Sequence, residues 1–319
     1  MIDKISHKKL FLTGASGLLG SNIAYCLKEK YDILGLYHTH PLVLNGVKTV
    51  GGDLLDHEAL RKTITEFSPE VVIHCAALPD IERCEKDHGL ADRLNVTATR
   101  NIVDCTPPSV RFIHISTDAI YDGEKKNFSE TDPIHPLNYY AITKYRAETE
   151  ALKRKKLLIV RTSFFGWDIQ NKNSLAEWVV EELSNQRRIK GFTDVMTCSI
   201  YTFHLARLLD QAVEKDLIGI YNFVCRNAIS KYDFTARLAE LFGLNSSLID
   251  PISVDEFPFS AKRSKNLTLD TTKLSSSLQR DLPSMEESLQ AFFLDFKNGK
   301  ADSLLNEQFK NLKLQNINP

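Results

Sequence analysis

Short apolar runs alternate with longer amphipathic stretches along the first half of the chain. The apolar runs have the length and the Val, Ile and Leu content of β-strands, whereas the stretches between them repeat apolar residues with the period of an α-helix. The pattern predicts strands at residues 9–13, 32–37, 47–51, 71–76, 111–116 and 157–161. It predicts helices at residues 18–29, 57–67, 81–105 and 137–154.

Strands that alternate with helices in this way indicate βαβ units. A parallel strand with both faces covered by helices should be almost continuously apolar, as residues 71–73 and 157–160 are. Crossover connections between parallel strands are right-handed almost without exception. The expected fold is therefore α/β, with a doubly wound parallel sheet of the Rossmann type.

The pattern changes after Arg161. Helices are expected at 174–185, 203–214 and 231–242, with short irregular segments between them, and the weak periodicity of residues 246–264 predicts surface loops. We therefore expect two domains. Residues 1–163 should form the sheet domain, and residues 164–319 a smaller, mainly helical lobe of which some segments return to the sheet domain.

The charge balance and the cysteines exclude several classes of protein. The 319 residues carry 40 Lys and Arg against 41 Asp and Glu, a formal net charge of −1, so there is no basic excess for binding nucleic acid. No apolar run has the length of a membrane span, and no signal-peptide core precedes the first strand. The six cysteines are scattered without a Cys-x-x-Cys pair, which favours neither a metal site nor a disulfide framework. We expect a cytoplasmic protein without a bound metal.

A glycine-rich turn joins the first predicted strand to the first predicted helix. Gly14 permits a tight turn, Gly17 lets the backbone approach a pyrophosphate, and Gly20 lets the helix pack closely on the strand. Glycines also collect in purely structural turns, but a position between a strand and a helix favours dinucleotide binding. The candidate cofactor contacts in this turn are Gly14, Ser16, Gly17, Leu18 and Leu19.

The end of the second predicted strand bears on the choice between NAD and NADP. An acidic residue there would bond the ribose 2′-hydroxyl of NAD and repel the 2′-phosphate of NADP. Residues 37–40 contain no acid, which favours NADP over NAD with His38 and Thr39 as donors, unless these are simply loop residues. Asp53, after the third strand, is placed either to reach the adenine or to cap the next helix. Further candidate cofactor contacts are Leu54, Cys75, Ala76 and Ala77.

Tyr140 and Lys144 lie four residues apart in the predicted helix 137–154, and therefore on one face of it. An ammonium beside a phenol favours the phenolate and lowers the pKa of the phenol from about 10 toward neutrality. Such a tyrosine can donate a proton to a carbonyl or accept one in the reverse direction. Ser116 and Thr117 offer hydroxyl partners at a strand end, where doubly wound sheets bind ligands. On the pattern alone, Tyr140 is equally well explained as a surface aromatic lying against Lys144.

In combination these motifs resemble the extended short-chain dehydrogenase/reductase family and, within it, the dTDP-4-dehydrorhamnose reductases. The likeness runs in order over most of the chain, and its middle block is the most specific part. The segments that carry it are Ser116-Thr117-Asp118, Tyr121-Asp122-Gly123, Glu130-x-Asp132-Pro133, Pro136-Leu137-Asn138-x-Tyr140-x-x-Thr143-Lys144 with Glu148, Arg161-Thr162-Ser163, and Asn266-Leu267-x-Leu269-Asp270-Thr271-x-Lys273-Leu274.

The resemblance implies that NAD(P)H reduces the C4 ketone of a nucleotide-linked deoxysugar. It implies that the first domain binds the cofactor and that the second domain binds most of the nucleotide-sugar substrate. It is compatible with either a monomer or a homodimer. The catalytic roles carry over onto three residues of this chain. Thr117 would bond the substrate ketone, Tyr140 would protonate it, and Lys144 would hold the nicotinamide ribose and tune Tyr140.

Two positions depart from these reductases. They usually carry an aromatic residue directly after Ser-Thr-Asp and a tryptophan after Arg-Thr-Ser, where this chain has Ala119 and Phe164. Both positions look like walls of the sugar pocket, so a different or larger sugar is expected. Similar chains imply two alternatives. One is an epimerase or dehydratase, against which the missing acid at 37–40 argues; the other is a non-catalytic regulatory subunit like that of methionine adenosyltransferase, against which the intact catalytic trio argues.

Overall fold

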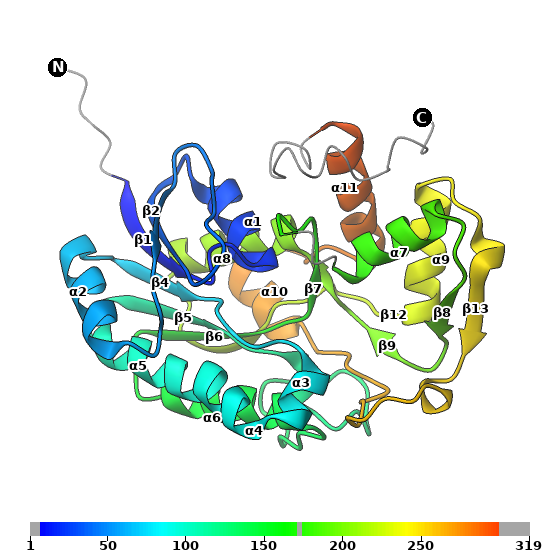
Figure 1. Cartoon of the computed structure of the whole chain (residues 1–319), viewed down its shortest axis with the longest axis horizontal. Coiled ribbons are helices and arrows are strands. Elements are labelled where there is room, and N and C mark those ends of the chain that lie inside the picture. The colour runs from blue at the N-terminus through cyan, green and yellow to red at the C-terminus, as the bar shows by residue number, and fades with distance from the viewer. Residues whose placement is uncertain (1–6, 171–173, 300–319) are drawn as a thin grey trace.

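A seven-stranded parallel sheet forms the centre of the protein. The computed structural model describes residues 7–170 and 174–299. The strand order is β11–β6–β5–β4–β1–β2–β3 and every neighbouring pair is parallel, which confirms the expected doubly wound α/β fold (Figure 1). The strands are β1 (Lys8–Thr13), β2 (Tyr31–Tyr37), β3 (Lys48–Gly51), β4 (Val71–His74), β5 (Arg111–Ile115), β6 (Leu157–Arg161) and β11 (Gly219–Asn222).

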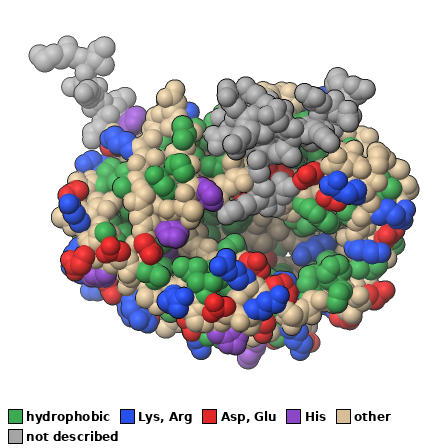
Figure 2. Space-filling model, viewed as in Figure 1, with side chains coloured by type: hydrophobic (Ala, Val, Ile, Leu, Met, Phe, Trp, Pro, Cys, Tyr) green, Lys and Arg blue, Asp and Glu red, His purple; other side chains and the backbone are tan. Residues whose placement is uncertain are grey.

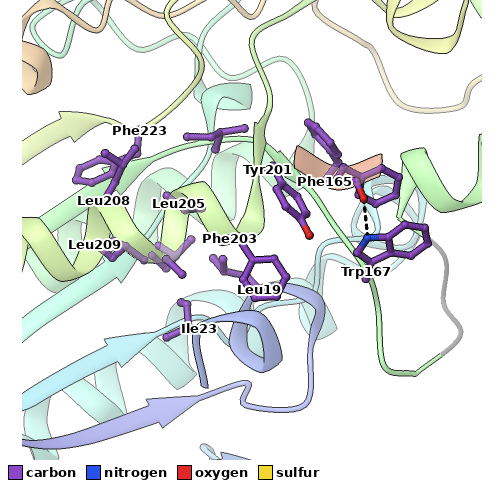
Figure 3. Close-up of a cluster of buried hydrophobic side chains, with 14 of the residues drawn as sticks. Leu19, Ile23, Phe165, Trp167, Tyr201, Phe203, Leu205, Leu208, Leu209 and Phe223 are labelled. Atoms are coloured by element: carbon purple, nitrogen blue, oxygen red, sulfur yellow. Dashed lines mark hydrogen bonds between the residues drawn. The ribbon is translucent and has the colours of Figure 1, made fainter. Parts of the chain in front are cut away.

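Helices cover both faces of this sheet because its central strands are apolar on both sides. In β1, Leu10 and Leu12 belong to the core on one face, whereas Phe11 belongs to the core on the other. Figure 3 shows part of the first core, where Leu19 of α1 lies beside Phe203 of α8. The first face is covered by α1 (Leu18–Leu27) and α8 (Thr202–Glu214), and the second by α2 (His57–Phe67), α5 (Ala98–Cys105) and α6 (Tyr139–Ala151).

Most of the chain after β6 forms a second group of elements, at the right of Figure 1. Three elements of this part lie at the main sheet instead, since β11 pairs with β6, α8 packs against α1, and α10 (Thr272–Leu278) packs against β11. The second group contains three short strand pairs, β7 with β10, β9 with β12 and β8 with β13. Its elements are β7 (Phe164–Phe165), α7 (Leu175–Ser184), β8 (Ile189–Phe192), β9 (Met196–Thr197), β10 (Ile200–Tyr201), β12 (Ile229–Ser230), α9 (Lys231–Leu241), β13 (Ile249–Ile252) and α11 (Met285–Lys297).

Two expectations about single elements are wrong in part. The expected helix at 81–105 is divided into α3 (Ile81–Lys86), α4 (His88–Ala91), a π-helical segment (Asp92–Thr97) and α5. The break lies at Asp87, whose side chain accepts the Leu90 N–H and so begins a new helix. The expected loops at 246–264 contain β13, which is held in place by its pairing with the distant β8.

The described part of the chain holds no helix with the length and apolarity that a membrane crossing requires. Within the same residues, no three His, Cys, Asp or Glu side chains gather in a way suited to a metal ion. Within the described residues no disulfide joins the six cysteines, and Cys84, Cys105, Cys198 and Cys225 are buried.

Candidate active site

The carboxyl ends of β1 and β4 lie side by side in the middle of the sheet. From β1 the chain continues to β2 and β3 on one side, and from β4 it continues to β5 and β6 on the other. Open α/β sheets bind ligands at the carboxyl edge where the strand order reverses in this way. Figure 2 shows a hollow in the middle of the molecular face, between the sheet and the group around α7 and α9. Residues that follow β1, β4 and β5 are therefore placed to meet a ligand.

The turn after β1 leaves no room for side chains at two of its glycines. Gly14 has a φ of +64°, and a Cβ there would lie 2.8 Å from the backbone nitrogen of Ala76. A Cβ on Gly20 would collide with the carbonyl oxygen of Gly14. Gly17 is the N-cap of α1, and no side chain caps the helix, so the N–H groups of the first turn can face an anion. This cradle, which includes the buried Ser16, fits the pyrophosphate of a dinucleotide.

The remaining candidate cofactor contacts near the glycine turn lie in two segments, one after β4 and one at the start of α1. Cys75, Ala76 and Ala77 are half-buried and follow β4, and the Cys75 N–H donates to the last carbonyl of β1 at 3.3 Å. Leu18 and Leu19 begin α1. Because the Leu19 side chain is buried in the core (Figure 3), only its backbone can face a ligand.

The candidates for the adenosine end lie after β2 and β3. His38 and Thr39 are exposed, and the Thr39 hydroxyl lies 3.1 Å from Nδ1 of His38. Asp53 is exposed and closes its own turn by accepting the N–H two residues onward, beside the half-buried Leu54. The alternative that Asp53 caps α2 is wrong, because Asp56 is the N-cap of that helix.

Thr117, Tyr140 and Lys144 come together at the carboxyl end of β5. Asn138 caps α6, which sets Tyr140 in the first turn of this helix and Lys144 one turn later. The Tyr140 phenol and the Thr117 hydroxyl are hydrogen-bond partners. The Lys144 ammonium donates to the Ile115 carbonyl at 2.8 Å. Thr117, Tyr140 and Lys144, which span 27 positions of the sequence, thus form one cluster at the same edge of the sheet as the glycine turn, with β4 between them.

Burial dominates the acid–base character of this cluster. It raises the pKa of Tyr140 well above its ordinary value, an effect that the hydrogen bond with Thr117 only partly opposes. It lowers the pKa of Lys144 to about 8. The expectation that Lys144 lowers the pKa of Tyr140 is wrong for this structure, because the ammonium is directed to the Ile115 carbonyl and desolvation of the phenol outweighs the other effects. Tyr140 therefore keeps its proton at neutral pH.

Two other tyrosines of this region, Tyr139 and Tyr121, are engaged elsewhere. The Tyr139 phenol donates to Asp92 at 2.8 Å, and its ring stacks on His88 with centroids 3.5 Å apart. The buried Tyr121 donates its phenol proton to the Ser129 carbonyl at 2.8 Å. These two tyrosines therefore serve packing and local hydrogen bonds rather than the cluster.

A buried ionic network, not foreseen from the sequence, lies behind the cluster. Glu148 and Arg161, whose side chains are each 2% exposed, pair at 2.8 Å. The Ser116 hydroxyl donates to Glu148 at 2.5 Å, so of the two hydroxyls expected after β5 only Thr117 is bonded to Tyr140. Arg161 also donates to the Tyr121 phenol at 2.6 Å. Arg161, a charged residue at the end of an otherwise apolar strand, is the sequence signal from which a buried counter-charge could have been inferred.

Comparison with known proteins finds one family over nearly the whole chain. Residues 8–298 match the family model described as RmlD substrate binding domain. The chain is 28% identical over 302 residues to the probable low-salt glycan biosynthesis reductase Agl14 of Haloferax volcanii, covering 90% of this chain and 99% of that protein. It is 28% identical to the dTDP-4-dehydrorhamnose reductase of Aggregatibacter actinomycetemcomitans (83% and 92% covered). It is also 28% identical to the methionine adenosyltransferase 2 subunit beta of Danio rerio (84% and 84% covered).

Solved structures share the fold from end to end. A dTDP-4-dehydrorhamnose reductase from Bacillus anthracis, solved in complex with NADP, superposes with a TM-score of 0.81 at 24% identity, covering 91% of this chain and 99% of that one. A hypothetical dTDP-4-dehydrorhamnose reductase from Sulfolobus tokodaii gives 0.77 at 28% identity (88% and 98% covered). A UDP-glucuronic acid 4-epimerase from Bacillus cereus, solved with NAD, gives 0.77 at 21% identity (91% and 99% covered).

Proposed function

Because the chain belongs to the RmlD substrate binding domain family, within the extended short-chain dehydrogenases/reductases, we propose that it is an NAD(P)H-dependent reductase of a nucleotide-linked 4-keto-6-deoxy sugar. The observation that carries this proposal is the cluster of Thr117, Tyr140 and Lys144 at the same edge of the sheet as the glycine cradle. A proton donor and an anion-binding turn at one edge are what a carbonyl reduction by a dinucleotide requires.

In this proposal each of the three side chains has a separate role, two at the ketone oxygen of the substrate and one at the ribose of the cofactor. The nicotinamide supplies the hydride when it is bound. Tyr140 is protonated at neutral pH because of its raised pKa, so it can donate a proton to the ketone oxygen as negative charge develops there. Thr117, which is bonded to Tyr140, can donate to the same oxygen. Lys144, with a pKa of about 8, stays largely cationic at pH 7 and can hold the ribose hydroxyls.

The sugar pocket of the proposed enzyme differs at two half-buried positions. Ala119 follows the Thr117-Asp118 pair in a short 3₁₀ turn, and Phe164 lies in β7. Each is smaller than the aromatic residue or tryptophan that the resembling reductases usually carry. We therefore propose a bulkier or differently substituted sugar than 4-keto-rhamnose.

The direct test is turnover of the purified protein. NADPH and a panel of dTDP- and UDP-linked 4-keto-6-deoxy sugars should give loss of absorbance at the wavelength of the reduced nicotinamide, with one hydroxyl sugar formed per cofactor consumed. Sugar-dependent conversion without net cofactor consumption would instead support an epimerase or dehydratase. Binding of the cofactor with no conversion of any sugar would support a regulatory subunit, which the similarity to methionine adenosyltransferase 2 subunit beta favours as the second candidate.

The cofactor preference has its own test at Thr39. Thr39→Asp should lower the preference for NADPH over NADH about tenfold or more, because a carboxylate there would repel the 2′-phosphate and could accept the 2′-hydroxyl of NADH. The measurement is the ratio of kcat/KM for the two cofactors. Asn45→Asp, at another exposed position between β2 and β3, adds the same charge and should leave the ratio unchanged. An unchanged ratio in Thr39→Asp would show that Thr39 does not face the 2′ position.

A further inference from the structure

A continuous row of hydroxyl groups and one carboxylate leads away from the Tyr140 phenol. Tyr140 bonds Thr117, and the Thr117 hydroxyl lies 3.2 Å from Oδ1 of Asp118. Asp118 accepts a hydrogen bond from the Ser163 hydroxyl. The Ser199 hydroxyl donates to that of Ser163 at 3.0 Å, and Ser199 and Thr197 lie 2.8 Å apart. Each member is within hydrogen-bond reach of the next.

Four separate parts of the chain build this row. They are the segment after β5, the first turn of α6, the second residue after β6, and the end of β9 with its connection to β10. Asp118 is 4% exposed, whereas Ser163 and Ser199 are partly exposed and can exchange protons with water. The row therefore connects the phenol to solvent through a carboxylate that is itself shielded from it.

Charged and titratable groups face Asp118 from each of the elements around it. They are Lys231 at the start of α9, Tyr140 on α6 and Cys198 between β9 and β10. Arg263 in turn faces Lys231. Burial raises the pKa of Asp118 to about 6, although the hydrogen bonds from Ser163 and Thr117 and the charge of Lys231 act against it. The carboxyl can therefore take up and release a proton near neutral pH.

We propose that Asp118 is the proton store of Tyr140 and returns a proton to it through the Thr117 hydroxyl in each turnover. The inference rests on the proposed reductase function. Asp118 touches neither ketone nor cofactor in this scheme, so it acts as a positioning residue for the proton rather than as a catalytic residue.

The step balances in atoms and charge. The carbonyl carbon of the sugar accepts the hydride from NAD(P)H, and its oxygen takes the Tyr140 proton with the former C=O electron pair. The phenolate takes the Thr117 hydroxyl proton while the Thr117 oxygen takes the carboxyl proton of Asp118. Asp118 becomes a carboxylate and regains a proton from water through Ser163 and Ser199.

The protonation state of Asp118 affects the acidity of the Tyr140 phenol. A carboxylate at this position raises the pKa of the phenol further and makes it a weaker acid. A neutral carboxyl removes that effect and can also supply the next proton. Reduction should therefore be fastest when Asp118 is protonated, which is the case below about pH 6.

The test is the pH profile of kcat for Asp118→Asn in steady-state turnover with NADPH and the sugar found active, from pH 5.5 to 8.5, because re-protonation of Tyr140 is needed only when the enzyme turns over repeatedly. In the wild-type protein the rate should fall roughly tenfold per pH unit above pH 6, because the carboxyl must be protonated. Asp118→Asn should be slower by about tenfold to a hundredfold at pH 5.5 with KM unchanged, and the difference should shrink toward pH 8.5. Asp122→Asn is the matched control in the same segment, since its carboxylate only accepts the Glu124 N–H, and should keep the wild-type profile.

A second variant keeps the proposal testable if Asp118→Asn does not fold. Ser163→Ala removes a hydrogen bond that favours the carboxylate, so the midpoint of the wild-type profile should move upward by about one pH unit. A loss of rate in Asp118→Asn that is the same at every pH, or an unmoved midpoint in Ser163→Ala, would overturn the proton store while leaving the reductase function intact. Absence of turnover in the wild-type protein would overturn both.

Discussion

Replacing Tyr140 with phenylalanine is expected to lower kcat for sugar reduction by about a hundredfold to ten-thousandfold, the usual contribution of a positioned proton donor. The change removes one oxygen atom from a half-buried ring and leaves the glycine cradle after β1 untouched. Cofactor affinity should therefore stay within about twofold, as measured by the fluorescence of bound NADPH. The combination of lost turnover and retained binding is specific to a proton donor.

Tyr139→Phe is the matched control for this experiment. It makes the same change one residue earlier in α6, where the phenol donates to Asp92 at the outside of the helix. Turnover should remain within about threefold of the wild type, because this partly buried hydrogen bond contributes little and lies away from the cluster. Equal losses in the two variants would indicate damage to α6, and full activity in Tyr140→Phe would rule out Tyr140 as the proton donor.

The architecture could be predicted from the sequence because its signals are local. The strands β4 and β6 are buried at every position, and this is why they are continuous in Val, Ile and Leu. The glycine turn was recognisable because a positive φ at Gly14 and the contact of Gly20 with the turn admit no other residue. Local steric constraints of this kind restrict which residue types can occupy a position, and they can therefore be recognised in the sequence.

Features that depend on distant partners could not be predicted in the same way. The strand β13 forms by pairing with β8 some 60 residues earlier, and β11 leaves the later part of the chain to extend the main sheet at β6. Nothing in the periodicity of either segment indicates its partner. The interruption at Asp87 was missed because an aspartate inside an amphipathic stretch is compatible with helix as well as with a cap.

In the candidate active site, too, features with local sequence signals could be predicted and features that depend on the whole fold could not. Thr117, Tyr140 and Lys144 were expected from their spacing and from the family resemblance, and the fold places them together. The sign of the effect on the pKa of Tyr140 was wrong, because burial depends on the whole fold and no spacing reports it. Ser163 and Ser199 were missed as members of a hydrogen-bonded row, since single serines carry no signal without a structure.

Removing one partner of the buried pair of Glu148 and Arg161 should destabilise the fold far more than breaking an exposed ion pair does. Glu148→Gln is expected to lower the free energy of unfolding by about 3–5 kcal/mol, because it leaves the Arg161 guanidinium buried without a counter-charge. The side chain keeps its size, so the loss reports charge rather than packing. The measurement is the midpoint of urea unfolding at unchanged m value.

Two further variants show whether the uncompensated charge of Arg161 causes the loss of stability in Glu148→Gln. Glu150→Gln makes the same change two residues later, where the carboxylate pairs with the half-exposed Arg100 at 3.0 Å, and should cost at most about 1 kcal/mol. Glu148→Met combined with Arg161→Met removes both charges and should restore at least about half of the loss, since apolar residues of similar volume often replace a buried pair at little cost. A double variant less stable than Glu148→Gln would mean that the network acts through its hydrogen bonds to Ser116 and Tyr121, which the two methionines cannot replace.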